Sequence, residues 1–356
     1  MKDFSQVIKE RERSGLLRKL AIPSGDIDFL SNDYLGLSKL PFSYQGENGS
    51  TGSRVLSGNS KSIEALEKRI CSTHGSEDAL LFPTGFIANL GVLSCVATRN
   101  DTFIMDDLCH ASLIDGALLS NAKRLKFKHN DLTDLEAKLS KAQGNLFIVV
   151  ESIYSMDGTC SDLKEISKLA QRFDALLIVD EAHSCGIEIK HENIDLNESV
   201  IRIVTYGKAF GSHGAAVLCS SDLKKYFINF CRPFIYSTAP SPHQVAGISH
   251  AYDSLEENLH RIDALKSLID YWILKKPKKL NWIESSSHIQ SLMIEGNENV
   301  ISLSEHLSTK GFATLPIRTP TVKPGTERIR FCLHSINTKS EIDALFNELD
   351  LWKKNV

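Results

Sequence analysis

The sequence predicts an α/β fold in which helices flank a mostly parallel central sheet. Short apolar runs recur along the chain, they alternate with amphipathic segments of helical period, and most lack polar alternation. Unalternating apolar runs are typical of strands buried on both faces of a parallel sheet. With 356 residues, 42% of them hydrophobic, the chain is long enough for one large and one small domain.

The first element with clear boundaries is a predicted helix at 59–75. Asn59 or Ser60 can cap its N-terminus, apolar residues recur at helical spacing along one face, and Gly75 ends it. Apolar runs that we expect to form strands follow at 79–82, 102–105, 146–150, 176–179, 202–206 and 215–219.

The pattern changes near residue 240. The stretch 240–274 predicts one long helix, and the sequence then predicts a strand, a helix and a strand at 285–296, 300–311 and 327–334. The first 45 residues contain a charged helix with no core of its own. We therefore predict an N-terminal arm at 1–45, a large domain at 46–240 and a small C-terminal α+β domain at 241–356.

Composition excludes several classes of function. The 41 basic residues nearly balance the 44 acidic ones, so we expect no nucleic-acid or membrane partner. No apolar run approaches the roughly 20 residues that cross a bilayer, and the charged N-terminus does not resemble a signal peptide, which predicts a cytoplasmic protein. The 8 cysteines lack metal-ligand spacing and predict free thiols, without structural metal or disulfides.

Residues that can perform chemistry follow several of the apolar runs. Ligands of open parallel sheets bind beyond the carboxyl ends of the strands. Asp180 ends one run and is followed by His183, while Glu151 ends another. Lys208 follows a third run and lies among glycines, which allow a ligand or another chain segment to approach closely. These strand ends are therefore the predicted site.

Together these residues match the requirements of a pyridoxal-phosphate site. The cofactor needs an amine, a carboxylate at its pyridine nitrogen, a stacking ring and a phosphate cup. Lys208 can supply the amine, Asp180 the carboxylate and His110 the ring. The candidates to bind the phosphate or the ring oxygen are Thr84, Gly85, Phe86, Ser155 and Thr205. Each is common alone in caps, turns or ion pairs, so the prediction rests on their conjunction.

Eight motifs resemble those of the α-oxoamine synthases, pyridoxal-phosphate enzymes that condense a small amino acid with an acyl thioester and release CO2. The motifs are SNDYLGLS (31–38), GSTGSRVLSGNS (49–60), LCHASL (108–113), ESIYSMDG (151–158), VDEAHSCG (179–186), VTYGKAFG (204–211), FIYSTAP (234–240) and RTPTVKPGTERIR (318–330). The resemblance spans nearly the whole chain. It implies a fold-type I pyridoxal-phosphate transferase that acts as a homodimer.

The resemblance assigns catalytic roles to four residues. Lys208 would be the Schiff-base lysine and the acid/base, and Asp180 the partner of the pyridine nitrogen. His183 would contact the ring oxygen, and His110 would stack on the ring.

It also assigns residues that bind substrate and phosphate. Asn32 and Arg330 would hold the amino-acid carboxylate, because a guanidinium fork suits that group. Arg328 is a weaker alternative that could instead form a structural salt bridge. Ser237 and Thr238 would approach the phosphate of the neighbouring subunit.

Within the family, the sequence is most similar to members that join L-alanine to a pimeloyl thioester, on coenzyme A or acyl carrier protein, in biotin synthesis. The arm arginines Arg11, Arg13 and Arg18 could bind the remote carboxylate of that donor, with Arg18 as the candidate, or simply lie on a solvated helix. Members that use glycine or L-serine remain alternatives, as does a non-catalytic binding protein. Four departures from the family pattern leave the acyl group open: Ala209, His213, Cys332 and Asn337.

Overall fold

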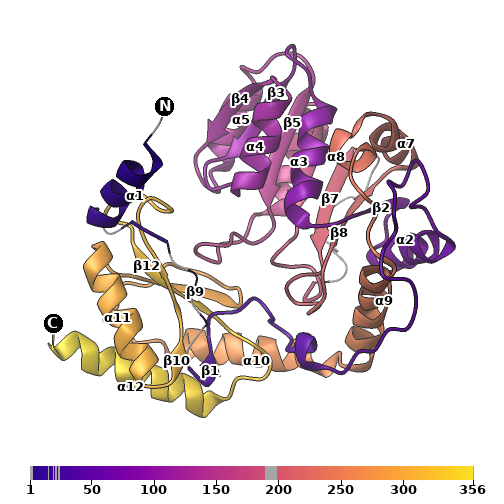
Figure 1. Ribbon diagram of the computed structural model, residues 1–356. Coiled ribbons are helices and arrows are strands. Elements are labelled where there is room, and N and C mark those ends of the chain that lie inside the picture. The colour runs from indigo at the N-terminus through magenta and orange to yellow at the C-terminus, as the bar shows by residue number, and fades with distance from the viewer. Residues whose placement is uncertain are drawn as a thin grey trace. The chain divides into compact units, whose positions relative to one another are not determined.

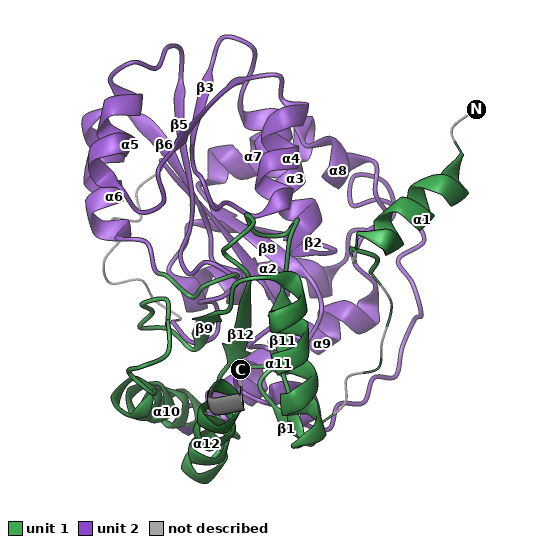
Figure 2. Cartoon of the chain, turned by 90° about the vertical axis from the view of Figure 1, so that its left-hand side faces the viewer, with its two compact units in different colours: residues 1–34, 156–159, 261–356 green, residues 35–155, 160–260 purple. Residues whose placement is uncertain are grey.

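A computed structural model describes residues 3–14, 16–18, 20, 22, 25–188 and 199–355. The chain forms two compact units, coloured separately in Figure 2. Unit 1 comprises 1–34, 156–159 and 261–356, and unit 2 comprises 35–155 and 160–260. The domain boundaries expected from the sequence remain predictions.

Unit 2 is built on a seven-stranded sheet (Figure 1). Its strands are β2 (Asp78–Phe82), β3 (Thr102–Asp106), β4 (Lys123–Phe127), β5 (Leu146–Glu151), β6 (Ala175–Asp180), β7 (Val200–Thr205) and β8 (Ala215–Cys219). Their order is β2-β8-β7-β6-β5-β3-β4, and only β8 runs antiparallel to its neighbours. The predicted α/β class is therefore confirmed, together with all six predicted strands.

Helices cover both faces of this sheet. They are α2 (Lys61–His74), α3 (Gly85–Val96), α4 (Ala111–Leu119), α5 (Leu132–Leu139), α6 (Leu163–Arg172), α7 (Ser221–Phe230), α8 (Arg232–Ile235) and α9 (Pro242–Glu257), and a 3-10 turn, η1, spans Leu37–Lys39. Successive strand residues point to opposite faces, so one core forms under α3, α4, α7 and α8, and the other under α5 and α6 (Figure 2). This arrangement explains why the strands are apolar without alternation.

Helix α2 shows how local sequence fixes an element. The Ser60 hydroxyl accepts the backbone N–H of Ile63 at 3.3 Å, which caps the first turn. Gly75 ends the helix with φ = 66°, a conformation that costs glycine little. Both predicted boundaries are confirmed, and Ser60 rather than Asn59 is the cap.

Strand β4 was missed in the sequence. It lies at the edge of the sheet, and four of its five residues, KRLKF, are at least partly exposed. Charged side chains are common on edge strands because they discourage pairing with another chain. An apolar-run criterion therefore finds the six mostly buried strands, including β2 at the other edge, but not this charged one.

Unit 1 contains a three-stranded antiparallel sheet of order β11-β12-β9, and a short parallel pair of β1 with β10. Its elements are α1 (Phe4–Arg13), β1 (Ile27–Asp28), most of α10 (His260–Lys275), β9 (Ile289–Met293), α11 (Asn297–Thr309), β10 (Phe312–Ala313), β11 (Leu315–Ile317), β12 (Arg328–Cys332) and α12 (Lys339–Asn355). The fully buried Trp272 packs against the rings of Phe331 and Phe346. The predicted strand–helix–strand order after residue 280 is confirmed.

The prediction of one long helix at 240–274 is wrong. The segment forms two helices, α9 and α10, separated at Asn258 and Leu259. Asn258 leaves the helical conformation (φ = −123°, ψ = 31°), and its amide donates to the Ser254 carbonyl at 2.8 Å. An asparagine side chain that bonds nearby carbonyls offers the backbone an alternative to continued helix.

The described residues include no helix that is long and apolar enough to cross a membrane. All eight cysteines are free thiols, and five of them are buried. Within the described ranges, no group of histidine, cysteine or carboxylate side chains could hold a metal ion.

Candidate active site

The side of the sheet at which the parallel strands of unit 2 end carries Asp180, His183 and Lys208. Asp180 is the last residue of β6, His183 lies in the turn that follows, and Lys208 lies in the loop between β7 and β8. The Lys208 Nζ atom is 2.6 Å from His183 Nε2. Asp180 and His183 are buried, whereas Lys208 is partly exposed. Neighbouring strand ends thus place an amine, an imidazole and a carboxylate together.

A chain of hydrogen bonds joins Asp180 to His110. The Asn89 amide nitrogen lies 2.6 Å from Asp180 Oδ2 and 2.9 Å from the Ser112 hydroxyl, and that hydroxyl is 2.8 Å from His110 Nδ1. The backbone N–H of Ser112 also donates to Nδ1, so the ring proton of a neutral His110 lies on Nε2. Desolvation lowers the pKa of His110, against the attraction of the Asp180 charge, which favours that neutral form.

Asn89 and Ser112 were not predicted as site residues. Both lie in helices that are apolar on most sides, α3 and α4, and both are buried. A weak signal was available, because a buried asparagine needs hydrogen-bond partners. Its partner could not be identified without knowing that α3 and α4 pack together at the end of β6.

The Asp180 carboxylate fits the pyridine nitrogen of pyridoxal phosphate. It is 5% exposed and accepts hydrogen bonds from the Asn89 amide and from the Ala182 backbone N–H at 2.9 Å. No cationic side chain of the described residues lies within ion-pair distance of it. A buried anion of this kind suits a cationic ring nitrogen, because buried charges require a partner. Lys208 and His110 are close enough for their charges to interact, and their roles as the amine and the stacking ring remain predictions.

The N-terminus of α3 meets the end of β7. The Thr84 side chain caps α3 by accepting the N–H of Ile87 at 3.2 Å. A Cβ atom added to Gly85 would lie 3.5 Å from Thr205 Oγ1, so these two predicted residues are neighbours. The Thr205 hydroxyl itself donates to the Gly214 carbonyl at 3.0 Å. The helix therefore begins at a small residue beside Thr205, and first-turn N–H groups of this kind bind phosphate.

The other predicted cofactor residues of unit 2 have less defined surroundings. The Phe86 ring is 44% exposed and lies edge-on to the His110 ring at 6.3 Å. Ser155 is partly buried in the segment after β5. Ser237 is partly exposed and Thr238 is exposed, and both follow α8. The roles expected of these residues remain predictions.

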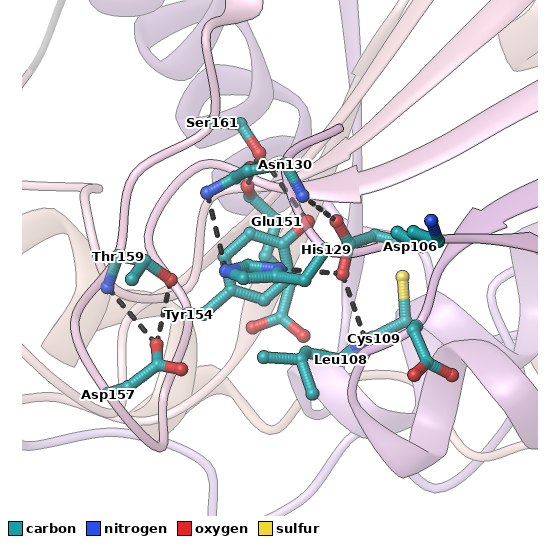
Figure 3. A network of polar contacts seen from close by, with 12 residues as sticks. Asp106, Leu108, Cys109, His129, Asn130, Glu151, Tyr154, Asp157, Thr159 and Ser161 are labelled. Carbon is teal, nitrogen blue, oxygen red and sulfur yellow. Dashed lines mark hydrogen bonds and ion pairs between the residues drawn. The ribbon is translucent and has the colours of Figure 1, made fainter. Parts of the chain in front are cut away.

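A second network, not predicted, holds the turn that leads to His110. The Asp106 carboxylate at the end of β3 accepts from His129 Nδ1 at 2.9 Å, and from the backbone N–H groups of Asn130 and Leu108 at 3.0 and 2.8 Å (Figure 3). Asp106 is 1% exposed. Its bond to the Leu108 N–H therefore holds the backbone of the turn that precedes His110.

Glu181 belongs to the same motif as Asp180 and His183 but has a structural partner. Its carboxylate accepts two hydrogen bonds from Arg202, Nε at 2.5 Å and Nη2 at 3.0 Å. The two side chains are 0% and 2% exposed. This fully buried, bidentate ion pair ties the turn after β6 to β7.

Asn32 and Arg330, predicted to bind the amino-acid carboxylate, lie together in unit 1. Arg330 Nη2 donates to Asn32 Oδ1 at 3.3 Å, and the Tyr34 hydroxyl donates to the same oxygen at 2.9 Å. The Cys332 thiol is 3.9 Å from that oxygen. One of the four departures from the family pattern thus adjoins this pair.

Two other residues of unit 1 make structural contacts. Arg328 forms a 3.7 Å ion pair with Asp157, which is the structural alternative considered for it. Asn337 accepts the N–H of His334 at 2.8 Å and donates to the Asp28 carbonyl at 3.2 Å. This second departure closes the turn after β12.

The arm arginines are exposed. Arg18 Nη2 donates to the Thr321 hydroxyl at 3.3 Å, within unit 1. Arg11 donates to the Leu16 carbonyl at 3.2 Å, and Arg13 lies at the end of α1. The expected role of Arg18 remains a prediction.

The two remaining departures, Ala209 and His213, both follow Lys208 in the loop between β7 and β8. Ala209 is 1% exposed, and a Cβ atom added to Gly186 would lie 3.1 Å from the Ala209 side chain, so only a small residue fits there. His213 lines a cavity of about 420 Å³ between α9 and the segment 37–42. Ala209 is thus accommodated by packing, and His213 faces solvent.

Comparisons with known proteins identify the family of this chain. The family described as aminotransferase class I and II matches residues 24–349. The 8-amino-7-oxononanoate synthase of Marinobacter nauticus is 32% identical, over 98% of this chain and 96% of that protein. Among solved structures, a serine palmitoyltransferase of S. paucimobilis with bound PLP has a TM-score of 0.86 at 23% identity, covering 99% of this chain and 96% of the other. The 8-amino-7-oxononanoate synthase of Francisella tularensis has a TM-score of 0.76 at 27% identity, covering 93% and 99%.

The chain therefore belongs to the aminotransferase class I and II family. Within that family it is an α-oxoamine synthase, a pyridoxal-phosphate-dependent acyltransferase of the fold-type I class. The family, fold, enzyme class and cofactor predicted from the sequence are confirmed.

Proposed function

We propose that this protein condenses L-alanine with a pimeloyl thioester, on coenzyme A or acyl carrier protein, to form 8-amino-7-oxononanoate for biotin synthesis. The observation that best supports this proposal is the nearly full-length similarity to an 8-amino-7-oxononanoate synthase, at 32% identity. The serine palmitoyltransferase likeness, at 23% identity, bears on the fold alone. When bound, pyridoxal phosphate supplies an electron sink for the amino-acid Cα.

In this proposal Lys208 Nζ holds the cofactor and then removes the α-proton of the amino acid. His183 Nε2, 2.6 Å away, can accept a proton from that amine and orient it. Asp180 keeps a proton on the pyridine nitrogen, because its carboxylate is buried and anchored by two hydrogen bonds. His110 packs on the ring, with its orientation set through Ser112.

The amino-acid carboxylate is bound by Asn32 and Arg330. Their contact supports this assignment, because Arg330 Nη2 donates to Asn32 Oδ1 at 3.3 Å and the two groups are therefore neighbours within unit 1. A planar guanidinium binds a carboxylate through two parallel hydrogen bonds, which fixes its orientation as well as its charge. The roles of both residues follow from the family motifs.

We also propose that the enzyme is a homodimer, in which Ser237 and Thr238 bind the partner's phosphate. Loop 49–60 lies beside this segment, since the Ala239 N–H donates to the Gly52 carbonyl at 2.9 Å. Large apolar side chains on both are exposed, notably Leu56 at 83% and Tyr236 at 72%. Such exposure favours burial by a second copy. The cytoplasmic location expected from the sequence stays a prediction.

A substrate panel tests the proposal. Purified enzyme saturated with cofactor is assayed for thiol release with L-alanine, glycine or L-serine against pimeloyl, acetyl, succinyl and palmitoyl thioesters. We expect L-alanine with the pimeloyl thioester to give the highest kcat/KM. A higher value for L-serine with the palmitoyl thioester would retain the α-oxoamine synthase chemistry and refute the biotin assignment. The Lys208→Ala enzyme is the blank for each pair.

A further inference from the structure

Glu151 and Asp180 are neighbouring buried carboxyl groups at the ends of adjacent strands. They are partners in register between the parallel strands β5 and β6. Such strands lie about 4.8 Å apart, and paired residues direct their side chains to the same face. Glu151 is 3% exposed and Asp180 is 5% exposed. The proposed mechanism uses Asp180 and leaves Glu151 without a role.

The two carboxyl groups have different hydrogen-bond partners. Asp180 accepts from the Asn89 amide and the Ala182 N–H, and both donors stabilise an anion. The Glu151 side chain accepts from the His110 backbone N–H, at 2.6 Å. No salt bridge to either group is found within the described segments. Two adjacent buried carboxylates cannot both ionise without a large cost, so one should keep a proton.

The proton belongs on Glu151. Burial, followed by the negative charge of Asp180, raises the pKa of Glu151 well above its usual value, against opposing contributions from Lys208 and the His110 N–H. Asp180 accepts two hydrogen bonds, whereas the Glu151 side chain accepts one, and Asp180 is the group proposed to face the cationic pyridine nitrogen. Both differences favour the anion on Asp180. The pair therefore carries one negative charge rather than two.

Glu151 also determines where His110 lies. His110 is the N-cap of α4, and its backbone is held by Glu151 while its ring is held by Ser112. Glu151 is itself fixed, because its own carbonyl accepts the Ser161 hydroxyl at 2.8 Å. A change at Glu151 should therefore move the His110 ring without removing any group that contacts the cofactor.

We propose that Glu151 is a positioning residue, a neutral carboxylic acid that anchors the His110 backbone and leaves Asp180 as the single anion beside the cofactor ring. The inference deepens the proposed site, since it rests on the cofactor lying between His110 and Asp180. It does not depend on which amino acid or thioester the enzyme uses.

Three variants separate charge from position. Glu151→Gln keeps a side-chain carbonyl for the His110 N–H and is uncharged at every pH. Glu151→Asp keeps a carboxyl group but is one methylene too short to reach. Glu151→Ala removes the contact altogether. Asp101→Asn is the matched control. Asp101 is a buried carboxyl that also accepts backbone N–H groups, but it lies just before the start of β3, at the opposite ends of the strands from Glu151.

The readouts are the equilibrium Kd for pyridoxal phosphate, from fluorescence quenching, and the pH titration of the bound cofactor's absorbance, both without substrate. We expect Glu151→Gln to match the wild type in both. Glu151→Asp and Glu151→Ala should raise Kd about tenfold, because the displaced His110 ring would lose its contact with the cofactor ring and one aromatic contact is worth up to about that factor. Asp101→Asn should lower the thermal midpoint of the apoenzyme and leave Kd unchanged.

Two results would overturn the inference. If Glu151→Gln moves the midpoint of the absorbance titration downward by about one pH unit, Glu151 is ionised in the wild type, because a nearby anion raises the pKa of the titrating cation. If both Glu151→Asp and Glu151→Ala retain the wild-type Kd, Glu151 does not position His110. Should the alanine variant fail to fold, the aspartate variant alone decides the second point. Failure of the substrate panel would leave these results unaffected.

Discussion

Breaking the ion pair between Glu181 and Arg202 should destabilise the protein without altering its chemistry. The guanidinium makes two hydrogen bonds to the carboxylate, and its third nitrogen, Nη1, donates to the His74 carbonyl at 3.0 Å. With the two side chains 0% and 2% exposed, water cannot replace either partner. Glu181→Gln would leave the Arg202 charge buried without a counter-ion.

The structure sets the size of the effect. Removing one member of a fully buried pair costs about 3–5 kcal/mol. In a chain of this length, each kcal/mol lowers the thermal midpoint by about 2 °C, so Glu181→Gln should lower it by about 6–10 °C. The Glu181→Leu, Arg202→Met double variant should recover part of this loss, since apolar replacements of a buried pair are often tolerated.

Differential scanning fluorimetry of the apoenzyme measures the effect. Lys168→Gln is the control: Lys168 pairs with Glu165 at 2.6 Å, but the two side chains are 59% and 43% exposed. That change should cost less than about 1 kcal/mol. If Glu181→Gln lowers the midpoint no more than Lys168→Gln does, the inference of a strong buried pair is wrong. Cofactor absorbance should be retained in every variant.

Four further experiments test the proposed site. Lys208→Ala should abolish borohydride trapping of the cofactor on the chain, measured by mass spectrometry. If the cofactor is still trapped in this variant, another lysine forms the Schiff base. Asp180→Asn should bind cofactor yet exchange the α-proton of L-alanine in deuterated water at least tenfold more slowly, so near-normal exchange would remove its role. Mixed dimers of Lys208→Ala and Thr238→Ala chains should be more active than either variant alone. If Thr238 acts in the partner's site, each mixed dimer has one site with both residues intact. Activity no higher than that of the two variants would argue against this arrangement. Arg18→Ala should raise KM for a free-acid pimeloyl donor more than for its methyl ester, with kcat little changed, and equal effects on both donors would make the arm structural.

The sequence was sufficient to predict the strands that are apolar on both faces, because burial on both sides leaves a pattern that needs no knowledge of neighbours. It was not sufficient for β4, whose charged residues lie at a sheet edge, or for the break at Asn258, where one side chain competes with helical hydrogen bonds. In both cases the deciding interaction depends on position in the fold or on a single local bond rather than on periodicity.

The residue types of the site were also evident from the sequence. Lys208, Asp180, His183 and His110 follow or adjoin apolar runs, and their chemistry together points to one cofactor. What the sequence by itself determined is therefore the class of fold, the cofactor and the side chains available to bind it.

Only the tertiary structure decided how those side chains are held. Asn89 and Ser112 connect Asp180 to His110, and Glu151 binds the His110 backbone, through contacts between elements far apart in the chain. Glu181, one residue from Asp180, is committed instead to Arg202. Hydrogen-bond partners and shared protons depend on distances of a few ångströms between strands and helices, and those distances exist only once the sheet and its flanking helices have assembled.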